Sequence, residues 1–386
     1  MPLSLAERDQ DHTAVAAAPR NADTPLALPL LQIVNAQSSD MGNRLFFIEF
    51  LRCFAIIQVI LLHASAPFAV AVSAKGNFWI GCIVDSAARS CVPLFLLISG
   101  MLLLSSTHEE SAVSFLRRRF WRVGMPLIAW TLIYCCWRLN NGAHLNWQSV
   151  VNQPACYHLQ YLYYLVGLYL ATPILRAFLK GADRRLVFYF LALWFVGASI
   201  LPALGSLTGI APPIIFTVTT GFSGYFILGY VLRDYKIAEN RYLHFGLLAF
   251  ACLAITIFGT YFLTFNQAVP KLNEALFDYS SPQVIVYSAI LFLAAKSFSF
   301  KFAGAAGRLA ARAIESLSAA SFTIYLVHPI ILSFLSSQFK WMLALEAHRS
   351  FLTVGYLMAV AVATLLLSWS FFLFCRLLKI PTWIAP

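Results

Sequence analysis

The stretch that decides the fold is LFFIEFLRCFAIIQVILLHASAPF, at residues 45–68. Glu49 and Arg52 are the only residues in it that are charged at neutral pH, and both lie in its first third. An apolar helix of about 20 residues is long enough to cross the hydrocarbon core of a bilayer. The stretch therefore predicts a membrane-spanning helix with two charges near one end.

The rest of the chain has the same character. Hydrophobic residues make up 60% of the 386 positions, charged residues only 11%, and the mean hydropathy is +0.75. A soluble domain carries about 25% charged residues because water wets its surface. We therefore expect an all-α, polytopic membrane bundle of about ten transmembrane helices. The expected spans are residues 45–68, 78–105, 120–139, 158–179, 186–203, 218–235, 243–265, 283–300, 315–336 and 351–376.

The basic residues between these spans predict the orientation. If the N-terminus is cytoplasmic, every inner loop holds more Lys and Arg than either of its outer neighbours, as in the clusters at 117–122 and 176–185. The positive-inside rule then places both termini in the cytoplasm. It also accounts for the net charge of +11. No stretch alternates basic and aromatic residues on a polar background, so we expect no nucleic-acid partner.

Two parts of the chain differ in composition. Residues 1–43 are mostly polar and rich in Ala, Asp and Pro, which predicts a disordered cytoplasmic tail, and residues 44–386 form the predicted membrane domain. The cysteines have no CxxC or Cys/His spacing typical of a metal site. We expect neither a structural metal nor a disulfide framework, because five of the eight cysteines lie within apolar runs: Cys53, Cys82, Cys91, Cys252 and Cys375.

Ionisable residues inside a membrane helix are costly, and each suggests a function. In the first helix, Glu49 and Arg52 are three positions apart and can form an ion pair. Arg52 and His63 are eleven positions apart, about three turns, so they share a face but lie roughly 16 Å from each other. A lone membrane histidine can simply bond a neighbouring helix. The aligned arginine favours a functional site in which His63 is an acid or base.

Other polar residues form five further candidate motifs, each with a simpler structural interpretation. Arginines at a cytoplasmic helix end can bind phosphate or merely set topology. Asp85 and Arg89 precede an expected helix break near Val92, caused by Pro93. Ser99 and Gly100 permit close helix packing. Finally, Tyr325 and His328 can be a packing pair, and residues 157–164 an interfacial aromatic belt. The arginines are Arg117, Arg118, Arg119 and Arg122.

Taken together, these motifs resemble the acyltransferase-3 family of multi-span membrane O-acyltransferases, from about residue 44 to the end. The resemblance rests on IExLR followed by His63, VPLF through Ser99-Gly100, and the arginine cluster. It also rests on YHL at 157–159 and SxxIYLxH at 321–328. The chain is most similar to the short members that O-acetylate surface polysaccharides and lack an added periplasmic domain. It departs from the family pattern at Glu49, where an aspartate is usual, and at Gln160, where tryptophan is common.

The resemblance implies a function and a location. It implies transfer of an acetyl or other short acyl group from cytosolic acyl-CoA to a hydroxyl of a cell-surface polysaccharide or its lipid-linked precursor. The expected place is the bacterial inner membrane, with no permanently bound cofactor. A transporter or flippase for an anionic or glycan solute is the alternative, and a regulatory subunit with a decayed site is a third interpretation.

The resemblance also implies roles for individual residues. The catalytic candidates are His63, Arg52 and Glu49. The acyl-CoA-binding candidates are Arg117, Arg118, Arg119, Arg122 and Arg89. The candidates for lining an acceptor site or pore are Ser99, His158, Tyr325 and His328. In the implied mechanism, Arg52 and the cluster hold the anionic end of acyl-CoA, and His63 is the general base.

Overall fold

The computed structural model describes residues 27–106, 110–142, 144, 146, 148, 152–209, 221–300, 302–338 and 350–386. The chain divides into two compact units, Met1–Asn43 and Arg44–Pro386, and the second is described here by itself. Residues 1–26 lie outside the described part, so the disorder predicted for them stays a prediction. Helix α1 begins at Ala27, so residues 27–43 are helical.

All regular structure in the described residues is helical, which confirms the predicted all-α fold. Short 3₁₀ or π-helical turns (η) adjoin several helices. The α-helices are α1 Ala27–Ala69, α2 Lys75–Ala88, α3 Cys91–Leu104, α4 Ala112–Arg119, α5 Met125–Asn140, α7 Gln160–Gly181, α8 Arg184–Phe195, α9 Leu201–Thr208, α10 Ser223–Leu232, α11 Tyr242–Phe265, α12 Pro282–Ser297, α13 Gly304–Gln338 and α15 Ser350–Leu377.

Eight helical segments in the described residues are long and apolar enough to cross a membrane. They correspond to eight of the ten expected spans. The expected span 120–139 falls on α5, which has 16 residues, and on a π-helical turn, η1, at Phe120–Gly124. The expected span 218–235 begins outside the described residues, and α10 within it has 10 residues. The first of these is therefore helical along its whole length, since η1 runs directly into α5, whereas the helix in the second is shorter than the sequence indicated.

The second expected span is interrupted, as predicted, but earlier than Val92. Helix α2 ends at Ala88 and α3 begins at Cys91, so the break lies at Arg89 and Ser90. Pro93 therefore stands in the first turn of α3, where a missing N–H leaves no helical hydrogen bond unmade. The break exposes backbone carbonyls and two polar side chains to neighbouring helices.

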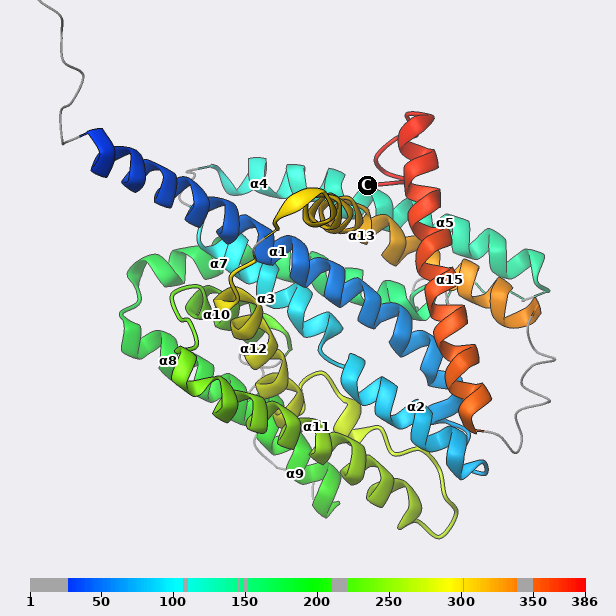
Figure 1. Ribbon diagram of the computed structural model, residues 1–386. Helices are drawn as coiled ribbons and strands as arrows, with labels where there is room; N and C mark the ends of the chain where they lie inside the picture. The colour runs from blue at the N-terminus through cyan, green and yellow to red at the C-terminus, as the bar shows by residue number, and fades with distance from the viewer. Residues whose placement is uncertain are drawn as a thin grey trace, which may run out of the picture. The chain divides into compact units, whose positions relative to one another are not determined.

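Helix α1 is bound to this break. The Gln58 side chain donates to the carbonyl of Ala87 at 2.9 Å and accepts from Ser90 Oγ at 2.9 Å. On another side of α1, the thiol of Cys53 donates to the carbonyl of Ile314 on α13 at 3.0 Å. The 46–69 portion of α1 thus lies between α13 and the α2–α3 pair (Figure 1). These bonds set the direction in which Arg52 and His63 point.

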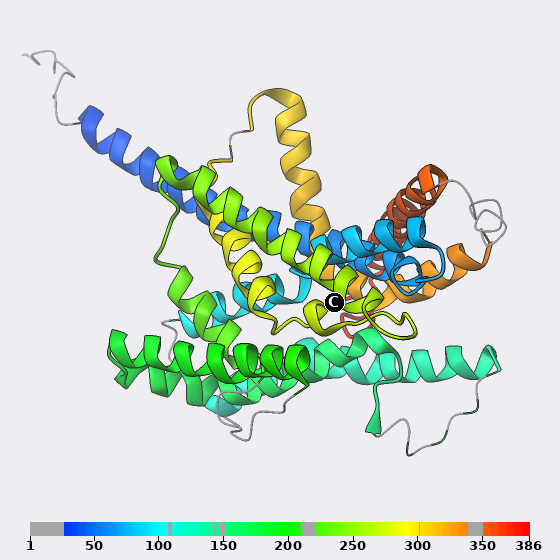
Figure 2. The same cartoon turned by 90° about the horizontal axis from the view of Figure 1, so that it is seen from below.

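Helices pack around this centre in layers. In the view of Figure 2, α5, α7 and α8 lie on one side of α1, and α15 lies on the other. Helix α11 packs against α12 and α2, and α13 packs against α15. The last residues fold back between α5 and α13, where Trp130 donates to the carbonyl of Ile384 at 2.9 Å and Thr323 to that of Pro386 at 2.8 Å.

Helices α3 and α10 pack closely, and two glycines make this approach possible. A Cβ at Gly100 would overlap the backbone of Phe226 on α10, and a Cβ at Gly229 would overlap the backbone of Leu97 on α3. The contact is reciprocal, so each helix presents a glycine to the backbone of the other. Small residues drive such packing in membranes, where lipid tails are as apolar as leucine. The predicted packing role of Gly100 is thereby explained.

We expect Gly100→Ala and Gly229→Ala each to destabilise the protein by about 1–3 kcal/mol or more, since backbone rather than a movable side chain must give way. The measurement is the thermal unfolding midpoint in detergent. Gly167→Ala and Gly355→Ala are matched controls, because a Cβ at either glycine meets nothing within 4 Å. Equal midpoints for all four variants would contradict this account of α3–α10 packing.

Candidate active site

Three histidine side chains from distant parts of the chain meet in the bundle. His63 comes from α1, His158 from the 3₁₀ turn η2 (Tyr157–Leu159), and His328 from α13. The ring centre of His328 lies 5.3 Å from that of His63 and 5.4 Å from that of His158. Tyr157 lies against His63, with ring centres 4.7 Å apart. The structure thus brings together three histidines that the sequence singled out separately.

Two of these histidines line a small cavity of about 120 Å³. His63 is partly exposed, whereas His158 is only 5% exposed and neither of its ring nitrogens has a hydrogen-bond partner. Among the described residues no Asp, Glu, Lys or Arg lines this cavity, so its polar groups are neutral hydroxyls, an amide and imidazoles. The lining residues are Val59, His63, Cys91, Val92, Tyr157, His158, Gln160, Tyr161, Tyr164, Phe222, Tyr279 and Tyr325.

A larger cavity, of about 650 Å³, is rich in arginine. Arg52 lines it together with Arg118, Arg119, Arg122 and Arg176, and Glu110 is the carboxylate among its lining residues. Its remaining wall is largely apolar or aromatic, from Phe95, Ser99, Leu102, Leu103, Ser106, Val123, Tyr161, Leu165, Tyr169, Ser318, Ala319, Ser321, Phe322, Tyr325 and Pro386. Such a cavity suits an anion attached to a long uncharged group.

The two cavities share a wall made of two tyrosines. Tyr161 and Tyr325 line both, and their ring centres lie 5.7 Å apart. Tyr325 Oη donates to the backbone carbonyl of His158, which ties α13 to the η2 turn. The arginine-lined cavity and the histidine-lined cavity therefore meet at this tyrosine wall, on the face of α1 that carries Arg52 and His63.

The arginines of the larger cavity differ in how well they are neutralised. Glu110 forms ion pairs with Arg118 and, at 3.7 Å, with Arg176. Arg119 has no carboxylate partner among the described residues, and its Nε is buried without a hydrogen bond. Burial lowers the pKa of the Arg119 guanidinium, although arginine stays charged at neutral pH. An anion bound in the cavity would offset this cost, so Arg119 is a natural anion ligand.

One known protein family matches the chain over most of its predicted membrane domain. The sequence model of the acyltransferase-3 family, described as an acyltransferase domain, matches residues 45–373. The chain belongs to the acyltransferase-3 family. The predicted family is thus confirmed, and the protein is an acyltransferase of the membrane. No curated protein and no solved structure matches the chain at a significant level.

Several of the residues predicted from the acyltransferase-3 motifs line these cavities, and others do not. Arg52, Ser99 and Tyr325 line the larger cavity, as do three arginines of the cluster. The fourth, Arg117, is exposed and is not among the lining residues. Arg89 lines neither cavity.

Opposite charges lie close together in the first two expected spans, and the sequence predicted an ion pair only for Glu49 and Arg52. Arg89 Nε lies 2.6 Å from Asp85 Oδ1, and Arg89 also donates to the carbonyl of Phe277 at 3.1 Å. Glu49 and Arg52 form no ion pair in the part of the chain that the structure describes, so the pairing that their spacing predicted is wrong. Arg52 faces the larger cavity instead.

Sequence reasoning missed three residues that line the larger cavity. Arg176 was counted only as a loop charge that sets topology, and Tyr161 only as part of an interfacial belt. Glu110 carried no signal, because it lies outside every motif. Their roles depend on contacts between α3, α4 and α7, which no local spacing reveals.

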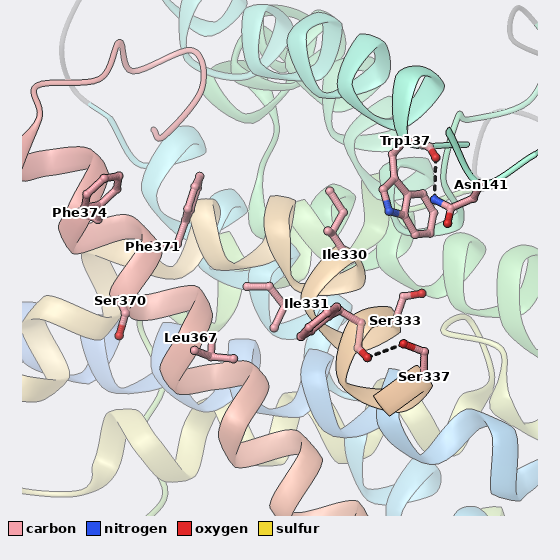
Figure 3. Close-up of a pocket in the computed structure, with 11 residues that line it drawn as sticks. Trp137, Asn141, Ile330, Ile331, Ser333, Ser337, Leu367, Ser370, Phe371 and Phe374 are labelled. Carbon is pink, nitrogen blue, oxygen red and sulfur yellow. Dashed lines mark hydrogen bonds between the residues drawn. The ribbon is translucent and has the colours of Figure 1, made fainter. Parts of the chain in front are cut away.

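The described residues show no candidate metal site, and one further groove among them has no titratable side chain in its lining. No three His, Cys, Asp or Glu side chains are placed to hold a metal ion. A groove of about 690 Å³ lies between α5, α13 and α15 (Figure 3). Its lining is apolar apart from Asn141 and three serines, and Asn141 and Ser337 already donate to helix carbonyls. The groove is therefore lined, among the described residues, by no Asp, Glu, Lys, Arg, His or Cys that could act as an acid, a base or a nucleophile.

The Asp85–Arg89 pair supports a sharp test of the role of Arg89. Asp85→Asn leaves a buried, unpaired guanidinium, and breaking such a pair costs about 3–5 kcal/mol, so the unfolding midpoint in detergent should fall steeply. Arg89→Gln/Asp85→Asn should recover part of this loss, because no charge remains. The apparent KM for the acyl donor of the double variant should match that of the wild type. A raised KM would show that Arg89 takes part in binding the donor.

Proposed function

We propose that the protein transfers an acetyl or other short acyl group from cytosolic acyl-CoA to a hydroxyl of a cell-surface polysaccharide or its lipid-linked precursor. The observation that carries this proposal is the meeting of an arginine-lined cavity with a histidine-lined one along a single face of α1. The membership in the acyltransferase-3 family supplies the reaction class.

The donor is proposed from the charges of the larger cavity. Acyl-CoA has phosphates at one end and its thioester at the end of a long, uncharged arm. Arginine side chains bind phosphate oxygens through bidentate hydrogen bonds. In our proposal Arg52, Arg119 and Arg122 hold the phosphates at the cytoplasmic side, and the arm extends past Ser99 towards Tyr161.

The distance along α1 agrees with such a donor. Arg52 and His63 are separated by about three helical turns, or roughly 16 Å. A compact donor could not contact both side chains at once. A donor with a flexible arm solves this, because its two functional ends are separated. Residues of the tyrosine wall would have to move slightly for the thioester to reach His63.

The chemistry follows from a neutral imidazole beside a thioester. His63 takes the proton of the acceptor hydroxyl as the oxygen attacks the carbonyl carbon. A new C–O bond forms and the C–S bond breaks, so the ester is released and the CoA thiolate takes the proton from His63. No further cofactor is needed, because the thioester is already activated.

The acceptor is proposed from the wall of the small cavity. Tyr157 and Tyr164 are exposed there, and Gln160 adds an amide. Hydroxyl and amide groups on a tyrosine-rich surface suit a sugar, which has both polar edges and apolar faces. The composition of the chain and its spans support a location in a bacterial inner membrane, with the acceptor reaching His63 from the face opposite the arginines.

The first prediction concerns His63. His63→Ala should abolish acyl transfer, because general-base catalysis is worth roughly 10²–10⁴-fold and this base touches the reacting hydroxyl. The measurement is free CoA released by purified protein when a glycan acceptor is added. Expression, membrane insertion and the thermal midpoint should stay as in the wild type. Normal acetylation of the surface polymer by the variant would refute the assignment. A wild-type protein that moves solute without releasing CoA would be a transporter.

The second prediction concerns the arginines. Arg119→Glu and Arg122→Glu should each raise the apparent KM for acyl-CoA about tenfold or more, since each replaces a phosphate ligand by a repelling charge. Arg117→Glu is the matched control, because Arg117 lies on the same helix as Arg119 but outside the cavity, and its KM should change much less. If all three reversals had the same effect, the cluster would act only through topology or general surface charge.

A further inference from the structure

Helix α13 contains a proline directly after a histidine. Pro329 has no backbone N–H, so the carbonyl four residues earlier, that of Tyr325, loses its helical donor. His328 replaces that donor: its Nδ1 lies 2.8 Å from the Tyr325 carbonyl oxygen and 3.3 Å from that of Ile324. A carbonyl oxygen only accepts hydrogen bonds, so Nδ1 carries the proton. Pro329 thereby fixes the tautomer of His328.

The other ring nitrogen of His328 is left as a lone pair. With the proton on Nδ1, neutral His328 has an acceptor at Nε2. His328 is 0% exposed, and Nε2 has no hydrogen-bond partner. A buried acceptor without a donor is destabilising, and it indicates a partner that the resting state does not supply.

His63 is in position to be that partner. The rings of His63 and His328 are nearly parallel, at 21°, with centres 5.3 Å apart. A hydrogen bond of about 2.9 Å between two ring nitrogens separates the ring centres by roughly 5 Å. The two ring centres therefore already lie at about the separation that such a bond requires. Catalytic hydrogen bonds are often misaligned in unliganded enzymes and tighten when substrate binds.

A general base needs its second nitrogen held. In a catalytic triad a carboxylate accepts the second N–H of the histidine, which sets its tautomer and orientation. Within the described residues no carboxylate lines the small cavity, and the rings that meet His63 are those of Tyr157 and His328. A buried carboxylate would also be costly in a membrane. A neutral imidazole with a fixed lone pair can take this place without adding charge.

We propose that His328 is the positioning residue of His63, and that Pro329 holds it ready by fixing its tautomer. In the substrate complex, one ring nitrogen of His63 donates to His328 Nε2, so the other faces the acceptor hydroxyl. That second nitrogen alone gains and loses a proton during transfer, and His328 stays neutral throughout. This inference rests on the function proposed above.

The experiment compares acceptor and non-acceptor side chains at position 328. His328→Gln keeps an acceptor oxygen and should retain most of kcat. His328→Phe keeps the ring area but has no acceptor, and kcat should fall roughly 10²-fold, within the range of general-base catalysis. The KM for acyl-CoA should stay unchanged in both, because the arginine-lined cavity is untouched. His244→Phe is the control, since His244 is exposed on α11.

Pro329→Ala tests the tautomer without altering either histidine. The substitution restores a backbone N–H to the Tyr325 carbonyl, so His328 Nδ1 is no longer needed as its donor. We expect kcat to fall about tenfold while the thermal midpoint is kept or raised, since a helical hydrogen bond is added. The double variant His328→Phe/Pro329→Ala should be no slower than His328→Phe alone, because both changes act through the same hydrogen bond.

Three results would overturn the proposal. Equal kcat for His328→Gln and His328→Phe would mean that the ring only packs against His63. A Pro329→Ala variant with wild-type kcat would remove the tautomer argument. His158 lies as close to His328 as His63 does, so His158→Phe must also be made. If it costs as much kcat as His328→Phe and the two losses do not add, Nε2 serves His158 instead. In each case the wild type still releases CoA, so the proposed function is tested separately.

Discussion

Every polar group inside this bundle has to find its partner within the protein, because hydrocarbon offers none. The interruption between α2 and α3 shows how the requirement is met. Gln58 joins α1 to the freed carbonyl of Ala87 and to Ser90, and Arg89 is neutralised by Asp85 and the Phe277 carbonyl. These bonds orient α1. The imidazole nitrogens that stay unsatisfied belong to His158 and His328, and both rings lie beside the small cavity's His63 or in its wall.

Close helix packing then builds the cavities around α1. Gly100 and Gly229 let α3 approach α10 until backbone meets backbone, which leaves the opposite face of α3 to line the two cavities through Cys91, Phe95 and Ser99. Helix α7 adds Tyr161, and α13 adds Tyr325. The tyrosine wall between the cavities therefore comes from two helices and is held by one hydrogen bond, that of Tyr325 to the His158 carbonyl.

The arginines of an acyltransferase-3 protein need not share one task, and here they do not share one environment. Arg89 is buried in an ion pair and completes the fold, Arg117 is exposed, and Arg119 is half-buried against Phe115 and Tyr169 without a carboxylate. Of these three arginines, only Arg119 has a partly buried guanidinium that a bound anion would stabilise. Glu110 neutralises part of the remaining positive charge, because it pairs with Arg118 and Arg176, which line the same cavity.

The sequence by itself determined the helical class, eight of the spans and the common face of Arg52 and His63, because hydropathy and the 3.6-residue period act over a few turns. It also predicted a helix break before Pro93, two or three residues later in the chain than the break at Arg89 and Ser90. Only the tertiary structure decided that Glu49 does not pair with Arg52, that Arg176 joins the cavity while Arg117 does not, and that His63, His158 and His328 meet. Those contacts join residues up to hundreds of positions apart. They depend on how closely helices approach, which is set by glycines and buried hydrogen bonds on other segments rather than by the residues themselves.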